Sequence, residues 1–501
     1  MTPHTSTYRR PTPYSPISHL IKLLALATGL MLGFVVPVAK ACTILSGMDE
    51  NGVVWYGGNE DFSFQPDTRM TVVPRGEGRA GMVLFAYRDG FPQAGITEHG
   101  LAFDFNALAA GPLPEDDDWL SRPLLTNPLE FMAVLQTATT VDALVAYMEQ
   151  YRIPGFNRSQ LHLADAKGNL AIYTTGAYCE SSGALVSTNF RICDKDVQQQ
   201  IADRPVDRWR YDTAEKLMVP NEVDFDDIRQ GLAATARPVF YSTIYSFIAN
   251  LQSGEFTLYY GADFEKGVSF TVSELVDQGP SSRLMRELLP ELPLSQFTER
   301  YEASGAEAAI AYLDAATDIT PQLRQEILRM TYSGLVTEPD VTRMNLSAAK
   351  RFFEEWMKGS TNGTEDFYKG LFALVEGDLK TARRELSLAA ENDALYTRFR
   401  EKSEAAIRRM DGEQPVAANR TLSLPGHRDA SSVFVHGPSP YYYILNFMTR
   451  TEDGWEGEFE FSEETTEDYV FVVDGNTVIK PEKVVANAAR SDAMAAATSA
   501  N

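Results

Sequence analysis

Cys42 is the strongest candidate for a catalytic residue in this sequence, because the residues before it have the pattern of a signal peptide that ends directly at this cysteine. Basic residues precede an uncharged apolar run over residues 23–38, and Ala39-Lys40-Ala41 matches a small-residue cleavage site. Cleavage after Ala41 would leave a thiol and a free α-amine on one residue. An α-amine with a pKa near ~8 can accept the thiol proton at neutral pH. Cys42 is therefore predicted to be a nucleophile that carries its own base.

Three other interpretations of this segment remain open. The cysteine could stand at the cleavage point by chance. In a lipoprotein it would carry lipid and could not be a nucleophile, although Lys40 argues against lipidation because small uncharged residues are expected there. An uncleaved membrane anchor is the third interpretation, but an apolar run of 16 residues is short against the roughly 20 needed to cross a bilayer.

The residues after Cys42 predict a hairpin that brings a carboxylate back to it. Residues 42–45 form a short apolar strand, Asp49-Glu50-Asn51-Gly52 a turn, and residues 53–56 a returning strand that leads to Asn59-Glu60-Asp61. Antiparallel pairing would place Asp61 near the start of the first strand, where it could hold the ammonium group of Cys42. Alternatively, Asp61 is a solvated turn residue.

The other two cysteines, Cys179 and Cys193, flank a predicted hairpin with strands over residues 170–178 and 184–190. They could form a disulfide or remain two buried thiols, because connectivity cannot be deduced from spacing. In either case Cys42 is the odd cysteine of the three.

Charge and length exclude some functions and suggest several domains. The 501 residues carry a formal charge of −24, and the charged side chains among the first 41 residues are all basic. A strongly acidic protein repels phosphate backbones, so nucleic acid is not an expected partner. The length exceeds what one hydrophobic core usually organises. We therefore expect a catalytic domain with additions.

Several motifs in order resemble the choloylglycine hydrolase and penicillin V acylase family of N-terminal nucleophile hydrolases, also called linear amide C–N hydrolases. The matching segments are Cys42-Thr43, Asn59-Glu60-Asp61, 95–101 (GITEHGL), Ser187-Thr188-Asn189, 210–217 (RYDTAEKL) and 241–245 (YSTIY). They cover residues 42 to about 275. Each motif alone is weak, but their order and spacing together are fairly specific.

The resemblance implies a role for each matching residue. Cys42 would attack the amide carbonyl, with its own amine as general base and acid. Asp61 would orient that amine. Asn189 would donate a side-chain N–H to the oxyanion, an interaction commonly worth ~2.7–4 kcal/mol, and Asn106 would be a second donor. Arg210 would favour the thiolate electrostatically.

Two positions leave questions open. Arg208, two residues before Arg210, is an acceptable alternative for the arginine near the nucleophile. Gly58 stands where many family members have an arginine that contacts the thiol and the substrate. Its absence, together with the acidic neighbour Glu60, puts bile-salt-like binding in doubt and favours a less characterised branch of the family.

Other catalytic motifs are absent from the sequence. It contains no H-E-x-x-H, C-x-x-C, G-x-S-x-G, Walker or G-x-G-x-x-G motif, so we expect neither a metal nor an organic cofactor. A papain-like pair of Cys42 with His162 is one alternative; in the other, His162 is a packed or surface histidine of the strand 160–164.

The periodicity predicts an α+β fold, which the resemblance sharpens to a four-layer αββα sandwich. Strands dominate residues 42–105 and 161–190 and return at 243–249 and 257–260, with helices at 128–151 and 208–218. Helices follow at 307–317 and 321–333, and residues 371–390 resemble a tetratricopeptide-type helix pair, although one unit does not establish a repeat. Strands are then expected at 421–424, 432–435, 441–447, 455–461 and 469–473. The expected division is a signal peptide (1–41), a hydrolase domain (42–279), a helical accessory region (280–412), a small antiparallel β module (413–486) and a flexible tail (487–501). Tyr441-Tyr442-Tyr443 could form a ligand platform or pack against a neighbouring domain.

Together these features predict a periplasmic or secreted hydrolase of non-peptide linear amides that works through an acyl-cysteine intermediate. Its expected partner is a small N-acyl amide, with no stable membrane insertion after signal removal. Phe62, Phe64, Phe103 and Phe105 could line an apolar acyl pocket or simply belong to the core. Two alternatives are an acyltransferase that uses the same intermediate and a lipid-anchored or periplasmic binding protein with a degenerate catalytic domain.

Overall fold

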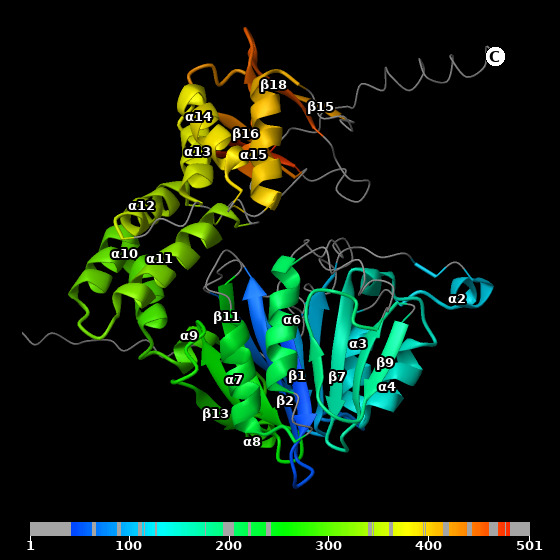
Figure 1. Cartoon of the computed structure of the whole chain (residues 1–501). Helices are drawn as coiled ribbons and strands as arrows, with labels where there is room; N and C mark the ends of the chain where they lie inside the picture. The colour runs from blue at the N-terminus through cyan, green and yellow to red at the C-terminus, as the bar shows by residue number, and fades with distance from the viewer. Residues whose placement is uncertain are drawn as a thin grey trace, which may run out of the picture. The chain divides into compact units, whose positions relative to one another are not determined.

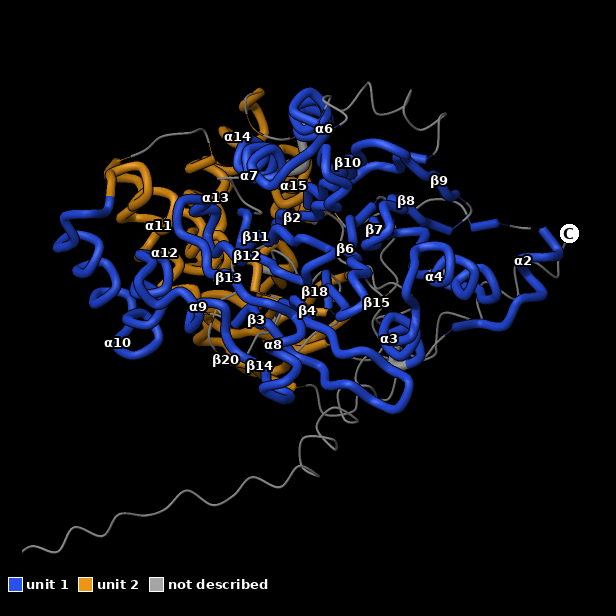
Figure 2. The backbone as a smooth tube through the Cα atoms, turned by 90° about the horizontal axis from the view of Figure 1, so that it is seen from below, with its two compact units in different colours: residues 1–319 blue, residues 320–501 orange. Residues whose placement is uncertain are grey.

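The computed structural model describes residues 42–480 with gaps at 63–66, 88–91, 109–112, 115, 126–127, 176, 194–204, 219–221, 237–241, 339–342, 344, 360–363, 394, 396, 414–419, 438–442, 460–468 and 476. The predicted signal peptide and tail lie outside these residues. The chain divides into two compact units, residues 1–319 and 320–501 (Figure 2). Within the described ranges, no helix combines the length and apolarity that crossing a bilayer requires.

The first unit contains two antiparallel sheets (Figure 1). The six-stranded sheet has the order β10 (Leu185–Ser187), β1 (Thr43–Met48), β2 (Val54–Phe62), β11 (Ser242–Asn250), β12 (Glu255–Tyr260) and β13 (Val268–Thr271). The eight-stranded sheet has the order β14 (Ser281–Leu284), β3 (Arg69–Val73), β4 (Met82–Ala86), β5 (Ala94–Thr97), β6 (Leu101–Ala107), β7 (Ser159–Asp165), β8 (Leu170–Thr174) and β9 (Ala177–Ser181).

The central strands are buried on both faces, which explains why their sequences lack a simple apolar-polar alternation. Strands β1 and β2 contact β6 and β7 of the other sheet, so the two sheets face each other. Helices α6 (Pro205–Leu217) and α7 (Phe225–Thr235) contact the six-stranded sheet, and α4 (Val141–Met148) contacts the eight-stranded one. The predicted α+β class with antiparallel sheets is confirmed. The αββα order of the four layers stays a prediction.

Two helical predictions need correction. The helix expected over 128–151 is two helices, α3 (Pro128–Thr137) and α4, because Thr140 caps the second by accepting a hydrogen bond from the Ala143 N–H. Helix α7 was not predicted at all. Its signal is a capping box in which Asp224 and Asp227 each accept a hydrogen bond from the other's backbone N–H.

The hairpin predicted around the two later cysteines is wrong. Strand β9 pairs with β8 at the edge of the eight-stranded sheet, whereas β10 pairs with β1 in the other sheet. The chain therefore changes sheets at the turn over residues 182–184. Cys179 and Cys193 are bonded to each other across this change, which leaves Cys42 as the free cysteine.

The first unit extends beyond residue 279, the predicted end of the hydrolase domain. Strand β14 pairs with β3, and the helices α8 (Val272–Asp277), α9 (Met285–Leu288) and α10 (Pro293–Ala315) belong to the same unit, with α2 (Asp117–Ser121) completing its helices among the described residues. The sequence of β14, Ser-Ser-Arg-Leu, lacks the alternation and β-branched residues that mark a strand.

The second unit begins with five helices in succession, α11 (Pro321–Val336), α12 (Leu346–Met357), α13 (Glu365–Val375), α14 (Leu379–Glu391) and α15 (Thr397–Met410). Each contacts the next along the chain. Buried aromatic rings, among them Tyr332, Phe353, Trp356 and Tyr368, pack between the first three. Asp378 separates α13 from α14 because its side chain caps the second of them.

Two three-stranded sheets follow, with the orders β15 (Arg420–Pro425), β18 (Gly454–Phe459), β17 (Thr449–Arg450) and β16 (Val433–His436), β19 (Val470–Val473), β20 (Thr477–Ile479). Apolar side chains from both sheets form one core cluster. The strand predicted over 441–447 is wrong in its described part, where Tyr443–Leu445 forms a short 3-10 helix. Tyr441 and Tyr442 lie outside the described residues.

Candidate active site

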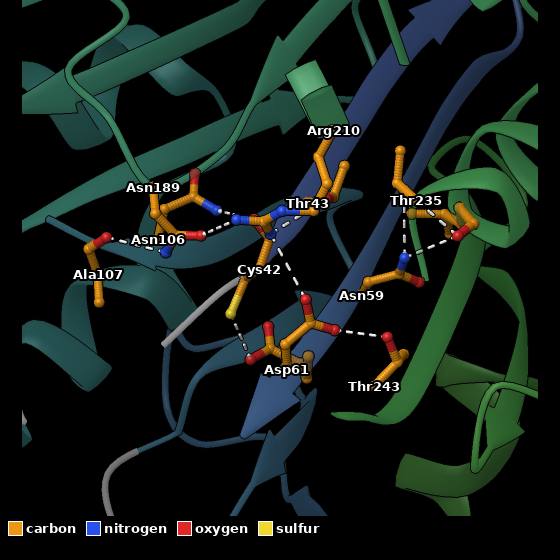
Figure 3. A network of polar contacts seen from close by, with 12 residues as sticks. Cys42, Thr43, Asn59, Asp61, Asn106, Ala107, Asn189, Arg210, Thr235 and Thr243 are labelled. Atoms are coloured by element: carbon orange, nitrogen blue, oxygen red, sulfur yellow. Dashed lines mark hydrogen bonds and ion pairs between the residues drawn. The ribbon is translucent and has the colours of Figure 1, made fainter. Parts of the chain in front are cut away.

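The start of β1 brings Cys42 beside the end of β2. Thr43 pairs with Asn59 across these antiparallel strands, so the next step along the register sets Cys42 against Glu60. Cys42 is fully buried, and its Sγ lies 3.3 Å from Glu60 Oε2. Figure 3 shows Asp61, Asn106, Asn189 and Arg210 around the same cysteine. The predicted hairpin thus does bring Asp61 back to Cys42.

Arg210 connects the predicted site residues to one another. It comes from α6, is fully buried, and donates from Nη1 to the Cys42 backbone oxygen at 3.1 Å. The same nitrogen lies 3.5 Å from Asp61 Oδ2, and Nη2 donates to Asn189 Oδ1 at 2.8 Å. Arg208 instead pairs with Asp212 one turn further along α6, and half of its side chain is exposed. Of the two arginines considered, only Arg210 reaches the cysteine.

Asp61 is held from a second side by the neighbouring strand. Thr243 is its register partner on β11, and Thr243 Oγ1 donates to Asp61 Oδ1 at 2.5 Å. Asp61 is fully buried. With one oxygen near Arg210 and the other on Thr243, the carboxylate has a fixed orientation. This contradicts the alternative of a solvated turn residue.

Both asparagines lie beside the cysteine (Figure 3). Asn106 on β6 donates from Nδ2 to the Cys42 backbone oxygen at 3.3 Å and accepts from Gln160. Asn189 follows β10 and donates from Nδ2 to the Ala107 oxygen at 2.9 Å. Both side-chain amides are therefore oriented by several partners before any substrate is bound, as preorganised oxyanion donors must be.

Three further residues meet at the thiol and were not singled out together from the sequence. Tyr87 Oη donates to Glu60 Oε2 at 3.0 Å. Asp104 on β6 is fully buried, and burial, followed by the charge of Glu60, raises the pKa of its carboxyl well above the usual value. The alternation in Phe103-Asp104-Phe105-Asn106 was the available signal, since it places Asp104 and Asn106 on one face of the strand.

The thiol of Cys42 is protonated at neutral pH in the chain that retains residues 1–41. Burial is the largest cause that raises its pKa, followed by the negative charges of Glu60, Asp104 and Asp61, while a hydrogen bond to the Asp61 backbone opposes them. In this chain the nitrogen of Cys42 belongs to a peptide bond. A nearby proton acceptor is therefore needed before the thiol can act as a nucleophile.

His162 does not supply that acceptor. Its Nε2 lies 2.8 Å from Ser46 Oγ and its Nδ1 lies 2.8 Å from Ser187 Oγ, so hydroxyl groups occupy both ring nitrogens. Burial lowers the pKa of His162 to about 3. The imidazole stays neutral at physiological pH and is a packed core histidine, so the papain-like alternative is wrong.

The four phenylalanines proposed for an acyl pocket separate into different surroundings. Phe103 and Phe105 belong to the core cluster that contains residues of α3 and α4, because they face away from Asp104 on β6. Phe62 stacks on Tyr87 with ring centroids 4.8 Å apart, which places it near the thiol. Phe64 lies outside the described residues. Among the described residues, no three His, Cys, Asp or Glu side chains are grouped in a way that could hold a metal ion.

Arg210 and Arg208 provide a matched test of the buried network. We expect Arg210→Ala to destabilise the protein by about 3–5 kcal/mol, because it leaves the buried Asp61 without its cationic partner. Arg208→Ala removes only an exposed helical ion pair, so its cost should be about 0.5 kcal/mol or less. Urea unfolding followed by circular dichroism measures both. Equal stabilities of the two variants would contradict the role given to Arg210.

Comparisons with known proteins gave structural similarities only. No protein-family model matches the chain, and no curated protein matches its sequence. A variant of the conjugated bile acid hydrolase from Clostridium perfringens superposes with a TM-score of 0.39 and 12% identity, over 48% of this chain and 96% of that one. Penicillin V acylase from Agrobacterium tumefaciens superposes with a TM-score of 0.33 and 18% identity, over 44% and 83% of the two chains.

Proposed function

We propose that the protein hydrolyses a non-peptide linear amide through an acyl-cysteine intermediate on Cys42. The observation that carries this proposal is the convergence of one free thiol, a fixed carboxylate and two oriented side-chain amides at the start of β1. The proposal includes cleavage after Ala41, which releases the α-amine, and a periplasmic or secreted location that follows from such a leader.

The proposed reaction consumes only the amide substrate and water. The α-amine takes the Sγ proton, and the thiolate forms a bond to the amide carbonyl carbon. N–H groups of Asn106 and Asn189 would stabilise the oxyanion, each by ~2.7–4 kcal/mol. Collapse of the tetrahedral intermediate breaks the C–N bond, and the α-ammonium protonates the departing amine. Water then attacks the thioester and gives its proton to the α-amine, which releases the acid and restores the thiol.

Asp61 and Arg210 act as positioning residues in this scheme. Asp61 is suited to hold the α-ammonium, because it lies beside Cys42 and is fixed by Thr243. Arg210 holds the Cys42 carbonyl, Asp61 and Asn189 in one arrangement. The intermediate can be tested directly by rapid acid quench of the processed protein with an N-acyl amide, followed by peptide mass spectrometry. An acyl mass on the Cys42 peptide is expected, and steady turnover with acylation of another residue would reject the mechanism.

The charge around the thiol predicts a substrate preference. Glu60, Asp61 and Asp104 are buried near Cys42, so an anionic group close to the scissile bond would be repelled. We expect kcat/KM for phenoxyacetyl or medium-chain fatty acyl amides with neutral leaving amines to exceed that for conjugated bile salts by at least about tenfold. A matched pair with one acyl group, on either an uncharged amine or glycine, isolates the effect of charge. A clear preference for glycine- or taurine-conjugated bile salts would contradict this assignment.

A further inference from the structure

A buried pair of carboxyl groups lies beside the Cys42 thiol, and the mechanism proposed above does not use it. Glu60 Oε2 lies 3.3 Å from Cys42 Sγ and accepts the Tyr87 hydroxyl at 3.0 Å. Glu60 is fully buried, as is Asp104 on the facing sheet. Because a carboxylate accepts hydrogen bonds and a thiol donates one, Glu60 holds the Sγ–H in a defined direction.

Asp104 and Glu60 are joined in a way that requires a proton. Among the described residues, no side-chain N–H or O–H group donates to either carboxyl oxygen of Asp104, whose hydrogen bonds are to the Glu60 carboxyl and to the Phe105 backbone. Two ionised carboxylates offer only acceptors, so one proton must lie between them. Two buried like charges in contact also disfavour double ionisation. The pair therefore carries one negative charge and one proton at neutral pH.

Gly58 provides the space that this pair occupies. A Cβ atom built on Gly58 would lie 2.2 Å from Asp104 Oδ2, closer than any non-bonded contact allows. A side chain at position 58 would displace the Asp104 carboxyl from its place facing Glu60. The glycine and the two acids thus form one structural unit next to the nucleophile.

We infer that Glu60 is a positioning residue for the Cys42 thiol, and that Asp104 acts through a proton shared with Glu60 to control how readily the thiol ionises. This inference rests on the proposed function for its catalytic meaning. Its physical content is independent of any substrate, because the ionisation of a thiol can be measured without one.

The other titratable groups that face the thiol are neutral or compensated near pH 7, so the charge of the Glu60–Asp104 pair is the one that affects thiol ionisation. Burial raises the pKa of Tyr56, Tyr87 and Tyr245, so these phenols are neutral near pH 7, and His162 is neutral as well. Asp61 is compensated by its contact with Arg210. Negative charge on the pair disfavours the thiolate, so removing it should lower the pH at which Cys42 ionises.

The test is the pH profile of iodoacetamide alkylation of Cys42 in the processed chain that begins at this residue. Glu60→Gln takes the charge away from Sγ and should move the midpoint of the profile down by at least about 0.5 pH unit, and the double variant, which has no charge on the pair, by at least about 1 unit. Asp104→Asn leaves the whole charge on Glu60 beside Sγ and should move the midpoint up. Asp142→Asn removes the same formal charge from the exposed first turn of α4 and should leave the midpoint unchanged.

Near-ultraviolet circular dichroism identifies the variants that keep the native packing. If Glu60→Gln does not fold, Asp104→Asn alone decides, because it keeps the shape of the side chain. Unchanged midpoints in folded variants would overturn the inference. Shifted midpoints together with no turnover of any amide would instead support the carboxyl pair and reject the proposed function, so the two failures can be distinguished.

Discussion

Replacing Cys42 by alanine should abolish amide turnover while the fold is retained. The substitution removes the attacking sulfur and a single hydrogen bond to Glu60, and alanine fits the buried start of β1. Loss of a nucleophile lowers kcat by a factor on the order of 10⁶ in well-studied hydrolases, which here means a fall to background. Product release measured by chromatography, with circular dichroism as the check on folding, tests this.

Cys42→Ser is the matched control, because it keeps a similar shape with a weaker nucleophile. It should retain traces of activity, since a hydroxyl is harder to ionise than a thiol. Alanine and wild-type proteins with equal turnover and the same secondary structure would show that Cys42 is not the nucleophile.

One extra residue before Cys42 should also eliminate turnover, for a different reason. The nitrogen of Cys42 would then be an amide, which cannot accept the thiol proton, and the thiol pKa would stay well above its usual value because of burial. The extended protein should remain folded, and its alkylation at neutral pH should be slower than that of the processed chain. Removing the extra residue with an aminopeptidase should restore activity.

Full activity in the extended protein would place the base elsewhere. Glu60 would then be the first residue to test, because its Oε2 lies 3.3 Å from Cys42 Sγ. His162 would not be a candidate, since its pKa of about 3 and its two serine partners prevent it from taking a proton at neutral pH.

Local patterns in the sequence were sufficient for the hairpin that carries the nucleophile. Alternation and a turn signal placed Cys42 and Asp61 together, and the register of β1 and β2 agrees with that expectation. The carboxyl pair could not be found in this way. Glu60 and Asp104 come from different sheets that meet face to face, and such contacts depend on how the layers pack rather than on sequence spacing.

The error at β9 and β10 has the same origin. Two short strands joined by Ser182-Gly183 look like a hairpin, but β10 completes the edge of the other sheet beside β1. Nothing in the turn chemistry distinguishes a hairpin from a crossing between sheets. The predicted end of the hydrolase domain near residue 279 was based on composition, and composition cannot indicate that β14 pairs with β3 as an edge strand.

The disulfide bond between Cys179 and Cys193 and the free thiol of Cys42 respond to redox conditions in opposite ways. The disulfide closes a loop across 14 residues that includes Asn189, a constraint worth about 3 kcal/mol in chain-entropy terms for a loop of this length. Cys42, by contrast, is a free thiol, and the proposed mechanism requires it to stay one. Strong oxidants would consume Cys42, whereas strong reductants would release the loop that carries Asn189. Under the proposed mechanism, full activity therefore requires an environment that is oxidising enough to keep the Cys179–Cys193 bond and mild enough to leave the Cys42 thiol unoxidised.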